Sequence, residues 1–105
     1  MKVNFSKNGN LIYEGYVSFD EGMWCLQMAD CVFAAEMPTK QGLIEEGCVL
    51  LEELLIRNLE KGYIRIPKTH LKPEEGSEIY KFELNKSLSN QILDFIKNGG
   101  KVKNA

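Results

Sequence analysis

Few residues of this sequence have types and spacings that could support catalysis. His70 is the only histidine, and the cysteines are Cys25, Cys31 and Cys48. A cysteine thiol beside a histidine base would be an activated nucleophile. Each cysteine, however, lies in an apolar pattern, where cysteine usually acts as a small hydrophobic residue. We therefore expect the cysteines to contribute to the core and not to catalysis.

Two pairs of adjacent glutamates, Glu45-Glu46 and Glu52-Glu53, could be considered as carboxylate pairs. Adjacent residues on a helix point about 100° apart, so these pairs cannot share a proton across a substrate. The cysteine spacing is too loose for a zinc site, which needs three or four nitrogen or sulfur ligands. No phosphate-binding glycine loop or nucleophile motif occurs. The sequence predicts a protein that is not an enzyme, with no catalytic residue, metal or cofactor.

The length of 105 residues predicts a single domain, 1–105. Thirteen basic and fifteen acidic residues give a net charge of -2, which disfavours a dedicated nucleic-acid binder. The odd number of cysteines suits a reducing compartment. Neither a signal peptide nor a membrane-length apolar run is visible. We therefore expect a cytoplasmic protein without membrane contact.

Alternating apolar and polar residues predict three or four antiparallel strands in the first third of the chain. Turns at Asn8-Gly9 and at residues 20–22 separate the first three. Tyr16 and Trp24 could lie either in the core or at an interface. The predicted strands cover residues 1–6, 11–19, 23–29 and 31–37.

From residue 40 to residue 61 the apolar period changes to that of a helix, with Thr39 as its cap and Gly62 as its end. Two adjacent apolar rows predict a stripe that covers one face of the sheet. Val49 and Ile56 lie seven residues apart at its flank. They either widen the core contact, which we favour, or form an apolar strip beside glutamates that suits a partner. The stripe comprises Leu43, Ile44, Gly47, Cys48, Leu50, Leu51, Leu54, Leu55 and Leu59.

The last part of the chain predicts a short strand at residues 63–67, a polar connector at 70–77, a strand and helix at 78–98 with Ser87 as helix cap, and a frayed tail at 99–105. The whole sequence therefore predicts an α+β fold. It has an antiparallel sheet of three or four strands with one long helix packed on one face, followed by a short strand, a further strand and a C-terminal helix.

This order of elements, with its residues, resembles the HicB family of antitoxins. The similar stretches are "YVSFDEGMWCLQMADC", "VFAAEMPT", "CVLLEELLIRNLEKG" and "YIRIPKT", within about residues 12–69. Asp30-Cys31 stands where the family has Gly-Cys, and "TKQGL" replaces its Thr-x-x-Glu-Ala helix start. The resemblance implies a partly RNase H-like α/β core at residues 1–69 that binds a small, basic, RNA-cleaving HicA toxin and masks its surface.

Family antitoxins also carry a C-terminal DNA-binding element, often of the ribbon-helix-helix type. By this resemblance the strand with Tyr80, Lys81 and Phe82 would be the ribbon. The second helix of that element does not follow in this sequence, so the strand could instead pair with a second copy and give a homodimer.

Three functions follow from these observations. The first is a non-enzymatic inhibitor module, an antitoxin, in which Glu45, Glu46, Glu52 and Glu53 face a basic protein partner together with Val49 and Ile56. The second is a small nucleic-acid-binding or transcriptional regulatory domain that uses the basic segments 66–73 and 97–103. The third is a phage or host inhibitor protein on the same scaffold.

Overall fold

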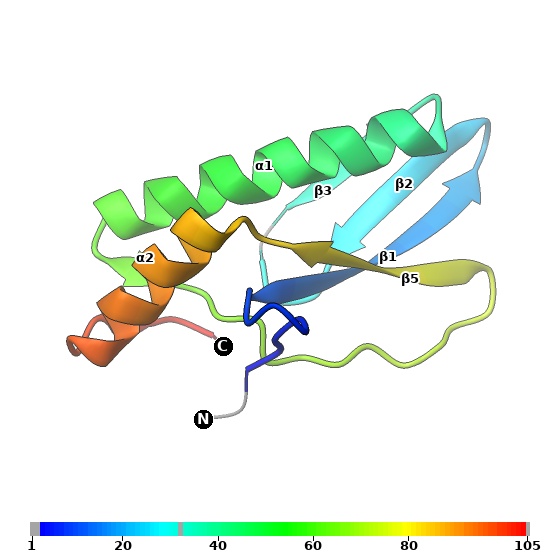
Figure 1. Ribbon diagram of the computed structural model, residues 1–105. Helices are drawn as coiled ribbons and strands as arrows, with labels where there is room; N and C mark the ends of the chain where they lie inside the picture. The colour runs from blue at the N-terminus through cyan, green and yellow to red at the C-terminus, as the bar shows by residue number, and fades with distance from the viewer. Residues whose placement is uncertain (1–2, 32, 105) are drawn as a thin grey trace.

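The computed structural model describes residues 3–31 and 33–104 and has the predicted α+β fold (Figure 1). A four-stranded antiparallel sheet carries the long helix on one face, and a second helix lies at the end of the sheet. The elements in chain order are β1 (Ile12–Asp20), β2 (Met23–Met28), β3 (Ala34–Met37), α1 (Lys40–Glu60), β4 (Tyr63–Ile64), β5 (Ser77–Glu83), α2 (Lys86–Lys97) and β6 (Lys101–Val102).

The main sheet has the strand order β3-β2-β1-β5. A two-residue turn joins β1 to β2, and its residues Glu21 and Gly22 have φ angles of 50° and 80°. Two consecutive positive φ angles are typical of the tight hairpin turn that matches the twist of the strands. On its other side β1 pairs with β5. The strand predicted after the connector is therefore the fourth member of this sheet.

α1 begins and ends where the sequence predicted. Thr39 caps its first turn, because its Oγ1 accepts a hydrogen bond from the Gly42 amide at 3.0 Å. A Cβ at position 42 would lie 2.8 Å from that oxygen, so the cap leaves no room for a side chain there. At the other end Gly62 has a φ of 88°, which stops the helix.

The close approach of α1 to the sheet depends on glycines that face Leu26. A Cβ at Gly47 of α1 would lie 2.7 Å from Leu26 Cδ2, and one at Gly15 of β1 would lie 2.9 Å from Leu26 Cδ1. Leu26 is 1% exposed and lies against both glycines, with Met28 beside it at Gly15 and Phe82 beside it at Gly47. The apolar residues buried around it include Tyr13, Val17, Met28, Leu43, Leu51, Leu55 and Phe82.

The predicted frayed tail is ordered over residues 101–104, so that prediction is wrong. β6 pairs in parallel with β4 in a separate two-stranded sheet, and the predicted strand at 63–67 is only two residues long. Beyond β6, the Asn104 side chain accepts from the Ile66 amide and donates to the Ile66 carbonyl, both at 2.8 Å. Asn104 therefore acts in place of a further strand residue, which a polar tail sequence does not indicate.

Two other expectations change at the ends of elements. The predicted strand at residues 1–6 lies partly outside the described residues, and its described part makes one isolated bridge, between Phe5 and Leu11. α2 is capped by Asn85 and not by Ser87, because Asn85 Oδ1 accepts from the Leu88 amide at 2.8 Å.

We expect Gly47→Val to destabilise the fold by about 2 kcal/mol, because the new methyl groups must displace Leu26 in a filled core. Equilibrium unfolding in urea measures the change. Glu53→Val is the matched control, because it introduces the same side chain at an exposed position of the same helix. Equal losses of unfolding free energy in the two variants would contradict the close contact at Gly47.

Candidate functional site

The outer face of α1, turned away from the sheet, carries an apolar pair among acidic side chains. Val49 is 49% exposed and Ile56 is 47% exposed. Glu45 and Glu53 are also exposed, while Glu52 is half-buried. Each of these residues is three, four or seven positions away from another of them, so they lie on one side of the helix. We call Glu45, Val49, Glu52, Glu53 and Ile56 the acidic strip.

The preferred interpretation of Val49 and Ile56 as additions to the core contact is wrong, since about half of each side chain is exposed. Local hydrogen bonds hold part of the strip. Gln41 Nε2 donates to Glu45 at 3.2 Å, and Asn85 Nδ2 donates to Glu52 at 3.1 Å. The fourth predicted glutamate, Glu46, is half-buried at the flank of the helix.

The predicted oligomer or DNA element lies within the sheet. Phe82 is 2% exposed and its ring packs against Tyr80 at a tilt of 57°, with centroids 4.7 Å apart, on the face that α1 covers. This burial leaves Phe82 unable to contact a partner. Lys81 points to the opposite face and is exposed. Since β5 pairs with β1 along its length, one edge of the proposed ribbon is already occupied.

The expectation that all three cysteines belong to the core holds only for Cys31. Cys31 is 5% exposed, Cys25 is half-buried on the face opposite α1, and Cys48 is exposed on α1. Burial, together with the Asp30 carboxylate, raises the pKa of the Cys31 thiol to about 12. Such a thiol stays protonated at neutral pH and is a poor nucleophile.

Tyr16 and Trp24 take different places. Trp24 is half-buried and packs against Phe19, with ring centroids 5.2 Å apart, at the hairpin end of the sheet. Tyr16 lies on the open face of the sheet, and its hydroxyl donates to the Lys72 carbonyl at 2.5 Å. Tyr16 is thus one of the residues that hold the connector in place.

His70, the candidate base, helps to fasten the connector across the open face of the sheet. The buried carboxylate of Glu14 accepts from the Leu71 amide at 2.8 Å and lies 3.5 Å from His70 Nδ1. The buried carboxylate of Asp30 accepts from the amide and the hydroxyl of Thr69 at 2.9 and 2.7 Å. Both carboxylates are used by the connector, so the arrangement is structural.

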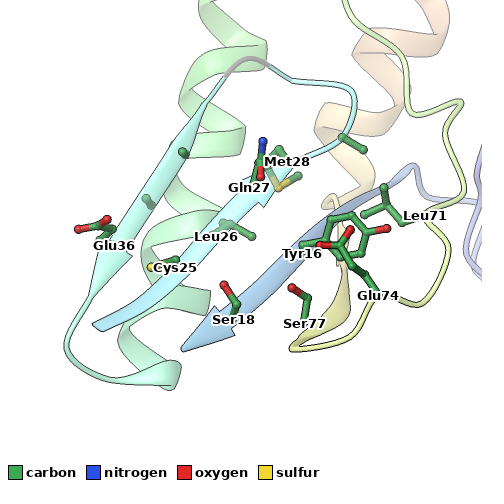
Figure 2. A pocket seen from close by; sticks show the side chains of 13 residues that line it. Tyr16, Ser18, Cys25, Leu26, Gln27, Met28, Glu36, Leu71, Glu74 and Ser77 are labelled. Carbon is green, nitrogen blue, oxygen red and sulfur yellow. The ribbon is translucent and has the colours of Figure 1, made fainter. Parts of the chain in front are cut away.

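A trough lies beside the connector on the open face of the sheet, with a volume of about 650 Å³ (Figure 2). The small side chains of Ser18 and Cys25 form the bottom of the trough and leave it hollow. Figure 2 shows Tyr16, Leu71 and Glu74 on one side of it and Glu36 on the opposite side. No lysine, arginine or histidine is among the described residues that line this sheet trough. Its charged groups are two carboxylates.

A smaller hollow, with a volume of about 210 Å³, lies between α1 and the start of β3. Its apolar lining consists of Phe33, Leu50 and Leu54, and Glu53 and Arg57 complete it. Because Glu53 also belongs to the acidic strip, this edge hollow and the strip adjoin each other.

Sequence reasoning missed the two buried carboxylates and the trough. Glu14 alternates with apolar neighbours as a solvent-facing strand residue would, and nothing local to it shows that the connector covers that face. Asp30 follows β2, and in the sequence it stands out only as the residue before Cys31 in place of the family's glycine. Both carboxylates accept hydrogen bonds from backbone amides that are distant in the sequence, Leu71 for Glu14 and Thr69 for Asp30. A local sequence pattern gives no signal for such contacts.

Within residues 3–31 and 33–104, no group of three or more metal-ligating side chains comes together. In the same part of the chain, no helix is long and apolar enough to cross a membrane. No family model, curated protein or solved structure matches this chain.

The raised pKa of Cys31 predicts how stability changes with pH. Because the folded pKa exceeds the unfolded value of about 8.5, the contribution of this thiol is complete below that pH and is lost as the pH rises toward 12. Between pH 8.5 and 10 we expect the unfolding free energy to fall by up to about 1.4 kcal/mol per pH unit from this group.

Urea unfolding in reductant from pH 7 to pH 10 measures this slope. Cys31→Ala should be less stable than the parent at pH 7 but should show a shallower decline with pH. The exposed position gives the control, since Cys48→Ala should keep nearly the parental slope. Identical slopes for the parent and Cys31→Ala would refute the assignment.

Proposed function

We propose that this protein is a non-enzymatic protein-binding inhibitor module, a HicB-like antitoxin whose acidic strip masks a basic, RNA-cleaving toxin. The observation that supports it is the exposure of Val49 and Ile56, at 49% and 47%, among glutamates on the outer face of α1. Apolar side chains at the centre of an interface supply binding energy, while a charged rim selects the partner.

The charge of the acidic strip favours a basic partner over a second copy of this chain. Two such faces in contact would bring glutamates together, and like charges across an interface cost several kcal/mol. A basic surface would instead be attracted at long range, which accelerates encounter at low ionic strength. An RNA-cleaving protein needs a basic surface to bind its substrate, so the strip could mask such a surface directly.

The prediction concerns Glu45 and Glu53, the two exposed acids of the strip. We expect Glu45→Lys combined with Glu53→Lys to slow association with the partner about tenfold or more at low salt, because it reverses the charge that attracts the partner. The partner to test is a short, basic protein with a lone histidine encoded in a neighbouring reading frame. Stopped-flow or surface binding kinetics measure the rate, and rescue of cell growth from the toxin measures inhibition.

The matched control is Glu21→Lys combined with Glu75→Lys, which makes the same charge change at exposed positions outside the strip. Val49→Asp should weaken the complex mainly through faster dissociation, because it removes an apolar contact. Equal association rates for the strip and control variants at low salt, with the fold intact in both, would reject the strip as the binding surface.

One observation supports the second candidate, a nucleic-acid-binding domain. The pairing of β4 with β6 places residues 63–65, which lead into the first basic segment, beside the end of the second, and Arg65 Nη1 donates to the Lys103 carbonyl at 2.7 Å. Lys103 Nζ lies 4.3 Å from the centre of the Tyr63 ring, and the side chain of Lys101 is exposed. A cluster of basic groups with an aromatic ring is suited to a nucleic-acid backbone.

For this candidate we expect retardation of RNA or DNA in a low-salt gel-shift assay that falls steeply as salt is added. Lys101→Glu combined with Lys103→Glu should lower the affinity for nucleic acid about tenfold. Lys81→Glu, at an exposed position of the main sheet, should leave that affinity unchanged. Absence of retardation at low salt would remove this function.

A further inference from the structure

β3 is a free edge of the main sheet. Its four residues pair with β2 on one side, and no other strand among residues 3–31 and 33–104 pairs with it on the other. An unpaired edge presents a row of amide and carbonyl groups that another extended chain can bond. β5 forms the opposite edge of the sheet, and the isolated bridge between Glu74 and Ser77 belongs to the turn that leads into it. What distinguishes the β3 edge is the pair of hollows beside it.

The pairing pattern identifies which groups of β3 are free. The two-residue turn makes Asp20 and Met23 a hydrogen-bonded pair, and such pairs recur at every second residue. The bond from the Ala29 amide to the Glu14 carbonyl, at 3.0 Å, fits this alternation. Leu26 therefore bonds toward β3, where its partner is Ala35.

It follows that Ala35 and Met37 use their backbone groups to bond β2, while those of Ala34 and Glu36 point outward. A strand added there would form its hydrogen-bonded pairs with Ala34 and Glu36. Pro38, which lacks an amide hydrogen, follows immediately and limits this edge to a short segment.

The two hollows lie on opposite faces beside this edge. The side chains of Ala34 and Glu36 line the sheet trough, and Ala35 and Met37 face the α1 side, where Phe33, Leu50 and Leu54 form the edge hollow. Successive side chains of an extended segment point to opposite faces. Those opposite Glu36 would lie beside its carboxylate, at the outer wall of the acidic trough, and the alternate ones would lie toward the apolar hollow.

From this arrangement we infer that β3 accepts an extended segment of a partner protein in which basic and apolar residues alternate. Charge selects this occupant: the ionisable groups of the trough are Glu36 and Glu74, so a lysine or arginine opposite Glu36 gains an ion pair. A second copy of β3 fits less well, because it would bring a second Glu36 to the same acidic face.

The inference deepens the proposed function by giving the partner a second point of attachment next to the acidic strip. The inference about β3 rests on the proposed antitoxin function only for the identity of the partner protein. The edge itself can be tested with a defined peptide, in a way that does not involve the strip.

The probe is a blocked hexapeptide of alternating valine and lysine at millimolar concentration. We expect it to slow hydrogen exchange at the Ala34 and Glu36 amides tenfold or more, as followed by NMR. It should also change the fluorescence of Trp24 on β2, which pairs with Met37 of β3. The control peptide has the same side chains and charge but is N-methylated at every backbone nitrogen, so neither of its edges can form a ladder. It should leave exchange at both amides unchanged.

Three variants make the test specific. Glu36→Pro removes an outward amide without removing a β2–β3 bond, since proline is tolerated at such edge positions, and it should abolish the protection. Glu36→Lys leaves the backbone groups unchanged but reverses the charge, and it should lower the affinity for the peptide tenfold or more. Glu45→Lys combined with Glu53→Lys should leave peptide protection intact, so failure of the acidic strip and failure of the edge are distinguishable.

Several results would overturn the inference. Equal effects of the methylated and unmethylated peptides would show attraction by charge alone. Protection at amides other than Ala34 and Glu36 would place the peptide elsewhere. Self-association in sedimentation experiments without peptide, abolished by Glu36→Pro, would show that a second copy occupies this edge.

Discussion

Leu26 packs between Gly15 of β1 and Gly47 of α1, and the arrangement of the surfaces depends on that contact. Gly15 and Gly47 leave room for its two methyl groups from opposite sides. The depth at which the helix lies on the sheet is set there, because a filled core tolerates neither a gap nor an added carbon. With α1 fixed at this depth and rotation, Val49 and Ile56 are turned outward, and the flank beside Leu50 and Leu54 remains open to β3.

The sequence predicts best the elements that depend on the local spacing of apolar residues. The alternation around Tyr13 and Val17 gave a strand, and the leucines from Leu43 to Leu55 gave a helix with a buried stripe. The width of that stripe was overestimated, because a helix on a sheet buries a narrow arc, which leaves Cys48 exposed. Asn58 shows the opposite error: it is 2% exposed, and its Nδ2 has no hydrogen-bond partner among the described residues.

The features that were missed depend on contacts between distant residues. Asn104 bonds the backbone of Ile66, and Asp30 bonds Thr69, so two segments that appeared to be a tail and a polar connector are held in place. These bonds also distribute the surface charge. They hold residues 63–66 beside the basic end of the chain at β4 and β6, away from the outer face of α1, and they keep the connector, with Glu74, along the wall of the sheet trough. A local pattern contains none of this information.

The central position of β1 has a consequence for the order of folding. Its pairing with β2 needs only a two-residue turn, but Ile12 meets Glu83 only after the chain has passed through α1 and the connector. Hairpins form within microseconds, whereas joining distant segments must overcome a larger loss of chain entropy. We therefore expect the hairpin and α1 to assemble first, which would leave the side of β1 later occupied by β5 unpaired for that interval. A neighbouring nascent molecule could pair with it at that stage, so the speed with which β5 arrives governs how cleanly this protein folds at high concentration.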